Sequence, residues 1–235
     1  MKVLISIASC LMYTKTGENQ IARDLWLNSL PSNVEVRFLL GNGQPTEQQD
    51  LDVQQSWLDR GHRYQNNTSL VPIVEYTPLQ DELLFSLPDS YKHCTFKVRE
   101  GYRWALDNSF DFVFQGCVDT YIDVQRLLDS GFENYDYIGD NHGFAACGGK
   151  GYWLSKKALE ICKDSHVDTW AWDSWTGSIL GKAGIQLHDD KRYAAYPTIP
   201  RVDNNIITSH LNISPEVYKI DKAKEVYNEH RRLYV

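Results

Sequence analysis

The sequence has no excess of basic residues, which limits the partners that we expect it to bind. Its 24 lysine and arginine residues are outnumbered by 31 aspartate and glutamate residues, so the formal net charge at pH 7 is -7. Non-specific affinity for nucleic acids comes mainly from basic side chains that neutralise phosphates. We therefore expect no extended nucleic-acid-binding surface.

Paired cysteines with the spacing of a zinc or redox motif are also missing. The chain contains five cysteines and no Cys-x-x-Cys pair: Cys10, Cys94, Cys117, Cys147 and Cys162. An odd count without such a pair predicts neither a structural zinc site nor a disulfide framework. Reduced thiols in a cytosolic protein are the simplest explanation.

No apolar run approaches the length of about 20 residues that a membrane-spanning helix needs. The first run, KVLISIA at residues 2–8, is too short for a signal peptide or an anchor, and we predict that it forms a β-strand. We therefore expect a cytoplasmic protein without a membrane span.

The glycines of CGGKG at residues 147–151 are not followed by the Gly-Lys-Ser/Thr of a phosphate-binding P-loop.

Apolar runs of strand length alternate with helical patterns along most of the chain. Residues 2–8 and 34–43 have the continuous apolar character of strands that are buried on both faces, and the second run ends in Gly-Asn-Gly. Between them, residues 17–30 carry apolar positions at helical spacing. A strand, a helix and a second strand in this order predict a parallel pair with the helix packed on the sheet.

The later segments extend this pattern. We predict strands at residues 70–76, 110–117, 135–140 and 185–190, and helices that begin near residues 46, 90, 121, 155, 172 and 214. Ser155 is the predicted N-cap of its helix, and the helix from residue 90 has a predicted apolar face of Phe96, Tyr102 and Leu106. We predict a long loop or hairpin at residues 191–215. We expect one domain over residues 1–235, with a mixed, mainly parallel sheet flanked by helices.

Polar side chains follow three of the predicted strands, at the point where each strand ends. Ser9 and Cys10 follow the first strand, Asn42 follows the second, and Asp119 follows the strand at residues 110–117. In an open α/β sheet, ligands bind beyond the carboxyl ends of the strands. We therefore expect these residues to line one crevice, although an isolated aspartate after a strand is more often a turn former or a helix cap.

Six blocks of the sequence occur in an order that is typical of one enzyme family. They are RDLWL, VRFLLG, a long block from TFKVREGYRW to FVFQGCVD, CGGKGYWLSKKALE, WDSWTGSILGKAGI and TSHLN. In this order they resemble blocks of the β-1,3-galactosyltransferase and fringe-like glycosyltransferases, and the likeness covers most of residues 23–212. The resemblance implies a GT-A-like fold, which is a Rossmann-like α/β fold.

The resemblance also implies a reaction and a site. The protein would be an inverting, metal-dependent glycosyltransferase that moves a sugar from a UDP-sugar to an acceptor hydroxyl, with Mn²⁺ or Mg²⁺ as cofactor. Asp119 and His210 would bind the metal, and Asp173 would be the general base. The nucleotide-sugar would contact the strand-end residues together with further residues of the blocks: Ser9, Cys10, Arg23, Asn42, Lys97, Cys117, Val118, Gly148 and Gly149.

The acidic motif departs from the pattern of the family. Where the family has Asp-Asp-Asp or Asp-x-Asp, this chain has Cys117, Val118 and Asp119. Either the metal is held more loosely, or neighbouring side chains compensate, with Asp123, Asp140 and His142 as candidates. His188, which stands beside Asp189 and Asp190, competes with His210 as the imidazole ligand. An imidazole ligand would favour Mn²⁺ over Mg²⁺.

Two other interpretations belong to different functional classes. The altered acidic motif supports a catalytically degenerate GT-A domain that binds nucleotide or glycan. A nucleotidyltransferase would need a glycine-rich segment near the N-terminus, and residues 6–19 contain only Gly17. For the enzyme, we expect a soluble bacterial or viral protein whose acceptor is a glycan, a glycolipid, a protein or a hydroxylated nucleobase. The acidic net charge argues against the last of these acceptors.

Overall fold

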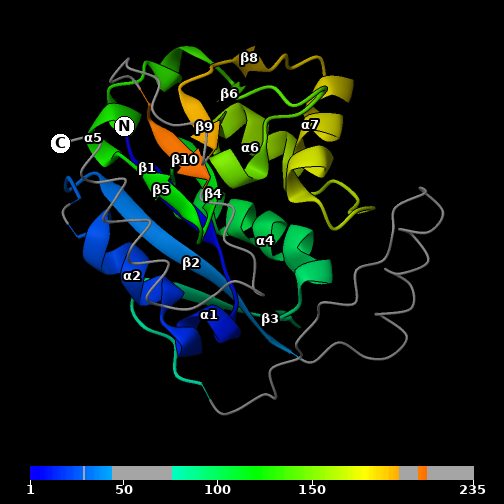
Figure 1. Ribbon diagram of the computed structural model, residues 1–235. Coiled ribbons are helices and arrows are strands. Elements are labelled where there is room, and N and C mark those ends of the chain that lie inside the picture. The colour runs from blue at the N-terminus through cyan, green and yellow to red at the C-terminus, as the bar shows by residue number, and fades with distance from the viewer. Residues whose placement is uncertain (29, 44–75, 196–205, 211–235) are drawn as a thin grey trace.

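The computed structural model describes residues 1–28, 30–43, 76–195 and 206–210 (Figure 1). The helices predicted near residues 46 and 214, and all but the last residue of the strand predicted at 70–76, lie outside this part of the chain. The described residues form a mixed α/β structure in which helices cover both faces of a central sheet, so the predicted fold class is confirmed.

Seven strands of the described residues form the central sheet, in the spatial order β3-β2-β1-β4-β7-β6-β8. β7 runs antiparallel to both of its neighbours, and the other pairs are parallel. The carboxyl ends of β1, β2 and β4 therefore lie at the same edge. The bounds are β1 Val3–Ala8, β2 Val34–Gly43, β3 Glu82–Pro88, β4 Phe112–Cys117, β6 Tyr137–Gly139, β7 Tyr152–Ser155 and β8 His188–Asp189.

Two apolar clusters hold the helices against the two faces of this sheet. Alternate residues of a strand face opposite sides, and Leu4 of β1 packs in one cluster while Val3 and Ile5 pack in the other. The first cluster contains side chains of α4, α6 and α7, and the second contains side chains of α2 and α5. The bounds are α1 Leu11–Thr16, α2 Glu18–Leu25, α4 Cys94–Asp107, α5 Val124–Leu128, α6 Lys156–Cys162 and α7 Trp172–Lys182.

A second, smaller sheet lies next to the end of β4. It consists of β5 Thr120–Ile122, β10 Thr208–His210 and β9 Tyr193–Ala195, in that spatial order. β10 is antiparallel to β5 and parallel to β9. The region that the sequence predicts as a loop or hairpin thus contributes two short strands, and one of them carries residue 210 to the end of β4.

Three local predictions are corrected by the structure. The strand β3 was not predicted, because its seven residues include Glu82, Ser86 and Pro88, and it pairs only with β2 at the end of the described sheet. β2 continues through the expected Gly-Asn-Gly turn, since Gly41 allows it to approach the backbone of residues 87–89 closely. The buried face of α4 is also rotated from the predicted one: Tyr102 is buried, but Phe96 and Leu106 are only partly covered.

The capping prediction for α6 is confirmed. Ser155 precedes the helix with extended backbone angles, and its Oγ accepts a hydrogen bond from the backbone N–H of Ala158 over 3.3 Å. Such a cap satisfies one of the unpaired N–H groups of the first turn. Among the helices of the described residues, none combines the length and the apolar character that crossing a membrane requires.

Candidate functional site

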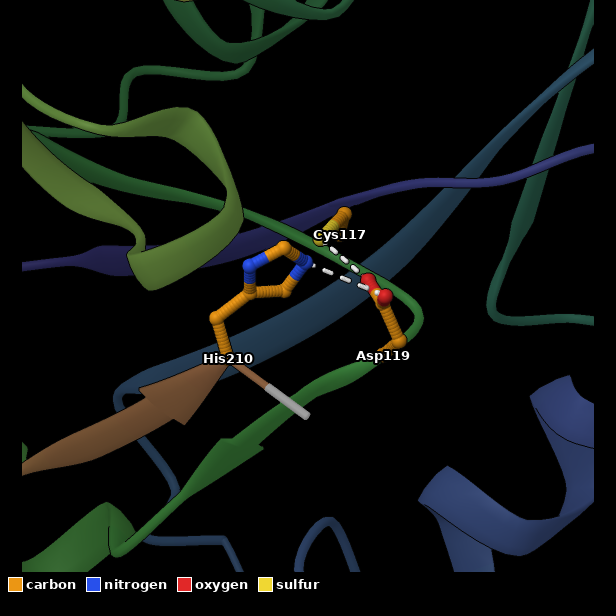
Figure 2. Close-up of side chains that lie close together, drawn as sticks. All are labelled: Cys117, Asp119 and His210. Carbon is orange, nitrogen blue, oxygen red and sulfur yellow. Dashed lines mark hydrogen bonds and ion pairs between the residues drawn. The ribbon is translucent and has the colours of Figure 1, made fainter. Parts of the chain in front are cut away.

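Cys117, Asp119 and His210 turn their polar atoms toward one another at the carboxyl end of β4 (Figure 2). The Sγ–H of Cys117 donates to Oδ1 of Asp119 over 2.7 Å, and Nε2 of His210 lies 3.1 Å from Oδ2 of the same carboxylate. The three donor atoms lie within 4.8 Å of one another, and the described part of the chain contains no second group of this kind. The two predicted metal ligands are therefore neighbours, and Cys117 joins them.

Two strand pairings bring these side chains together. Cys117 is the last residue of β4 and pairs with Ala8 of β1, so it lies at the edge of the sheet where ligands bind in open α/β folds. The antiparallel pairing of β10 with β5 sets His210 opposite Thr120, directly after Asp119 in the chain. The site is thus assembled from segments that are 91 residues apart in sequence.

Burial shapes the electrostatics of this group. The side chains of Asp119 and His210 are 15% and 24% exposed, and Cys117 is 9% exposed. Burial, and then the negative charge of Asp119, hold the pKa of the Cys117 thiol well above its usual range. The thiol is therefore protonated without a metal and acts as a donor to Asp119. The Oγ1–H of Thr120 fixes the neighbouring turn by donating to the carbonyl oxygen of Gly149 over 2.8 Å.

The predicted residues Gly148 and Gly149 form a short 3-10 turn, η3 Gly148–Lys150, beside this group. A Cβ atom on Gly149 would stand only 2.5–2.7 Å from three ring atoms of His210, and one on Gly148 would stand 2.9 Å from the indole of Trp172. These separations are shorter than any real Cβ contact. The absence of side chains therefore lets the turn lie directly against the imidazole on one side and the start of α7 on the other.

We expect Gly149→Ala to displace the imidazole of His210. Overpacking of a close contact costs about 1–3 kcal/mol of stability, and we expect metal affinity to fall about tenfold because a ligand loses its support. A matched control is Gly181→Ala in α7, where an added Cβ meets nothing within 4 Å. There alanine should be neutral or stabilising by up to about 1 kcal/mol. Melting curves and metal titrations of both variants test this, and equal behaviour would contradict the packing argument.

Asp173, the predicted base, lies in the first turn of α7 and holds the same glycine turn from the other side. Its Oδ2 accepts a hydrogen bond from the N–H of Gly148 over 2.9 Å, and its Oδ1 accepts one from the N–H of Ser174 over 2.7 Å. The N-cap position is Ala171, so the capping role expected of an acid at this point is only partly realised. The structure therefore places Asp173 and the cluster around Asp119 on either side of η3.

No family model matches the sequence, and no curated protein matches it. Solved structures do match. One is a glycosyltransferase involved in the glycosylation of the major capsid of PBCV-1, which is 11% identical, with a TM-score of 0.52 over 97% of this chain and 100% of the other. The chain has a GT-A-like fold. A nucleotide-diphospho-sugar transferase, provisionally assigned, from Desulfovibrio desulfuricans G20 is 12% identical over 81% of this chain and 80% of the other. Its TM-score of 0.42 is too low to support an argument.

Four more predicted contacts of the nucleotide-sugar lie at or near the strand ends of this GT-A-like fold. Ser9 is buried, and its hydroxyl donates to Oδ1 of Asn19 over 2.6 Å. Cys10 is partly exposed and precedes the first turn of α1. Asn42 is exposed near the end of β2, whereas the side chain of Val118 packs in an apolar cluster. Contact with a nucleotide-sugar stays a prediction for all four.

Arg23 has structural partners in this fold. Its guanidinium donates to both carboxylate oxygens of Asp81 at 2.7 and 2.9 Å and to Glu82 at 2.8 Å, and it lies over the ring of Phe38 at 4.5 Å. These contacts fasten α2 to the start of β3. The predicted contact with a nucleotide is therefore not favoured, because the cation already has two carboxylate partners.

Lys97 is also paired, in a buried network at the carboxyl edge of the sheet. Its ammonium donates to Oδ1 of Asp89 over 2.7 Å and to the carbonyl oxygen of Ser9 over 2.7 Å. Asp89 in addition accepts from the backbone N–H groups of Leu11, over 2.6 Å, and Gly41, over 2.9 Å. Burial alone would lower the pKa of Lys97, but the negative potential of Asp89, Cys94 and Cys10 and the hydrogen bond to Asp89 together outweigh it, so the pKa is raised. This network does not favour the predicted contact with a diphosphate, and it gives Lys97 a supporting role, since the pair ties together the ends of β1, β2 and β3.

Replacing Lys97 by methionine should destabilise the protein by about 3 kcal/mol, because it leaves the buried carboxylate of Asp89 without its cation. This loss of stability is near the lower end of the range for broken buried ion pairs, since two backbone N–H groups continue to bind Asp89. The control is Lys157→Met, which removes a 68% exposed partner of Asp136 and should cost at most about 1 kcal/mol. Urea denaturation measures both. If Lys97→Met lost less stability than the control Lys157→Met, the structural role of the pair would be refuted.

The residues proposed to compensate for the missing acid are engaged elsewhere. Asp123 caps α5 by accepting from the N–H of Arg126, and Asp140 is ion-paired with Lys150 and Lys191. His142 is exposed. None of the three belongs to the candidate metal-binding group of the described residues, which does not favour them as compensating ligands.

The competing imidazole, His188, is corrected as well. It is exposed and stacks on Tyr135 with ring centroids 3.8 Å apart. The acids beside it are paired, Asp189 with Lys191 and Asp190 with Arg192. His210 is therefore the histidine that meets Asp119.

Two residues near the site were not predicted. Asp89 directly follows β3, as Asp119 follows β4, but the signal was weak because Glu82, Ser86 and Pro88 interrupt the apolar character of β3. Tyr13 had no such signal. Burial, followed by the negative potential of Cys10, Asp119 and Cys117, raises the pKa of its phenol strongly, so the ring lies within electrostatic range of the cluster.

Proposed function

We propose that the protein is an inverting, metal-dependent glycosyltransferase that moves a sugar from a UDP-sugar to the hydroxyl group of an acceptor. The observation that carries the proposal is the placement of Asp119, His210 and Cys117 at the carboxyl end of β4, with Asp173 across the glycine turn η3. In a GT-A-like fold this is the edge at which a ligand is expected.

The donor atoms of the cluster fit one divalent cation. Metal–ligand distances in proteins are about 2.0–2.6 Å, so donor atoms that lie within 4.8 Å of one another are close enough to share an ion. A carboxylate of Asp119 and the imidazole of His210 are a set that accepts Mn²⁺ more readily than Mg²⁺. When bound, the cation would neutralise the negative charge that grows on the leaving diphosphate.

The chain would contribute the proton acceptor. As the acceptor oxygen bonds to the anomeric carbon, the bond to the diphosphate breaks, UDP leaves, and the hydroxyl proton passes to a base. The carboxylate of Asp173 has its orientation fixed by two backbone N–H groups. An ionised carboxylate has about four lone-pair sites, so two stay available to an acceptor hydroxyl. Attack from the side opposite the leaving group inverts the anomeric centre.

The finer assignment within this class is the β-1,3-galactosyltransferase and fringe-like group, which rests on the order of the sequence blocks. We propose a cytoplasmic enzyme whose acceptor is a glycan, a glycolipid, a protein or a hydroxylated nucleobase. One structural neighbour is involved in glycosylating a capsid. This is a reason to include protein-linked glycans in an acceptor panel.

The test is a panel of UDP- and GDP-sugars, each incubated with the protein with Mn²⁺ or with a chelator. We expect release of UDP from at least one UDP-sugar, only with Mn²⁺, and faster release when the right acceptor is added. Calorimetry with UDP should show binding that requires the metal. Binding of UDP that is equally strong in the chelator would refute metal dependence, and no binding at all would refute the proposed donor.

The second candidate function is a degenerate GT-A-like domain that binds a nucleotide or a glycan. The observation that favours it is Cys117, which stands where an acid would be expected and donates a hydrogen bond to Asp119. The same panel separates the two functions. Metal-dependent binding of UDP without hydrolysis or transfer of any sugar would favour the degenerate domain.

A further inference from the structure

The sulfur of Cys117 has a place in the cluster that the sequence did not assign to it. Sγ points at the carboxylate of Asp119, on the side facing His210 (Figure 2), and its other polar neighbours are Oγ1 of Thr120 at 3.2 Å and the carbonyl oxygen of Gly149 at 3.9 Å. The sulfur therefore lies within 4.8 Å of the donor atoms of both predicted ligands.

We propose that the sulfur of Cys117 is itself a metal ligand, so that the site binds one divalent cation through sulfur, carboxylate oxygen and imidazole nitrogen. Such a site still accepts Mn²⁺, but compared with an all-oxygen motif its preference is shifted toward borderline cations such as Zn²⁺ and Co²⁺. The inference deepens the metal site of the proposed function and rests on it.

The geometry supports Cys117 as a metal ligand and not as a residue that only fills space in the site. Three donor atoms from two different segments converge, each within 4.8 Å of the others, in a place where all three side chains are at least three-quarters buried. The Sγ–H bond points at Asp119, so a cation bound to this carboxylate would lie next to the sulfur. Metal ligands are deprotonated on binding, and the thiol proton passes to solvent.

The chemistry also accounts for the departure from the acidic pattern. A thiolate carries the same charge as the carboxylate that it replaces, so the attraction for a divalent cation is retained without help from a neighbour. What changes is the softness of the ligand, because thiolates select Zn²⁺ and related cations whereas carboxylates suit Mg²⁺ and Mn²⁺. This agrees with the engagement of Asp123 and Asp140 in other contacts.

Cobalt alone, without nucleotide, tests the proposal. Co²⁺ bound by a thiolate absorbs in the near ultraviolet through sulfur-to-metal charge transfer, whereas Co²⁺ bound by oxygen and nitrogen does not. We expect this band in the wild-type protein and in Cys147→Ser, which removes another partly exposed thiol. We expect its loss in Cys117→Ser. Absence of the band from wild-type protein saturated with Co²⁺ overturns the proposal without relying on the folding of any variant, and so does its persistence in folded Cys117→Ser.

Competition between cations provides the second measurement. Most sites bind Zn²⁺ more tightly than Mn²⁺, so the informative quantity is the change of this ratio in Cys117→Asp. We expect the preference for Zn²⁺ to fall by about ten- to a hundredfold, the range that loss of a supporting contact commonly costs. An unchanged ratio overturns the proposal. If the cobalt band is present but no UDP-sugar binds, the glycosyltransferase proposal fails and the sulfur ligand stands. If UDP binds with Mn²⁺ but the cobalt band is absent, the sulfur ligand fails and the glycosyltransferase proposal stands.

Discussion

Replacing Asp119 by alanine is expected to abolish the metal-dependent binding of UDP while the chain stays folded. Asp119 is the one carboxylate of the candidate metal-binding group of the described residues; one of its oxygens meets Cys117 and the other meets His210. Without Asp119, a cation would keep only Cys117 and His210 of this group as protein ligands, and the carboxylate that joins these two side chains would be gone. Loss of a supporting contact alone costs metal affinity about 10- to 100-fold, so loss of the central ligand should cost at least the upper value.

The effect on stability should be small. The side chain is partly exposed, and its removal leaves a thiol that still has Oγ1 of Thr120 at 3.2 Å and an imidazole that reaches solvent. A net hydrogen bond contributes about 1 kcal/mol, so a melting temperature close to that of the wild type is expected.

Calorimetric titration of UDP at saturating Mn²⁺, repeated in a chelator, measures the effect. The matched control is Asp189→Ala, because Asp189 is an exposed acid at the end of β8 that pairs with Lys191 and lies outside the metal-binding group. The control should bind UDP as the wild type does. Unchanged affinity in Asp119→Ala with metal present would remove Asp119 from the site.

The sequence predicts the framework of this site well, because its evidence is local. A buried strand that ends in an acid places that acid at the carboxyl edge of the sheet, and this holds for Asp119 after β4. The position of His210 is different. Only the pairing of β10 with β5 brings it within 3.1 Å of Asp119, and no periodicity in the sequence specifies such a pairing. Its prediction came from the resemblance to a family and not from its surroundings.

The acidic partners of the two basic residues could not be predicted for a related reason. Lys97 stands in a helical pattern, and Arg23 does too, but neither pattern contains information on which acid each side chain will meet. Asp89 and Asp81 lie on segments that reach these helices only through the tertiary structure. A cation predicted to face a phosphate can equally be neutralised by an acid of the chain, and here the internal acids occupy both.

Replacing Asp173 by asparagine is expected to reduce sugar transfer by about a hundred- to ten-thousandfold, the contribution of general-base catalysis. Asparagine has nearly the same shape but cannot accept the proton of the acceptor hydroxyl at neutral pH. Donor binding does not involve that proton, so the affinity for the UDP-sugar and for the metal should change little. The turn that contacts His210 would still be held, provided that the amide oxygen takes the N–H of Gly148.

The substitution is not free of structural cost. Both oxygens of Asp173 accept backbone N–H groups, so one of these donors would face the amide nitrogen of an asparagine. An unsatisfied donor costs about 1–3 kcal/mol where it is buried, and the partly exposed position favours the lower end. A small loss of stability is therefore expected, although asparagine is itself a good helix cap.

Three measurements on one preparation separate a base from a support. Transfer to the acceptor, UDP-sugar affinity and the melting temperature are compared with those of Asp123→Asn, which makes the same change at an acid that accepts the N–H of Arg126 at the start of α5. We expect lost transfer with nearly unchanged donor affinity in Asp173→Asn, and unchanged transfer in the control. Parallel loss of donor affinity and transfer would mean that Asp173 supports the glycine turn and His210. Transfer within tenfold of the wild type would exclude Asp173 as the base, because a loss of at least about a hundredfold is expected when a base is removed.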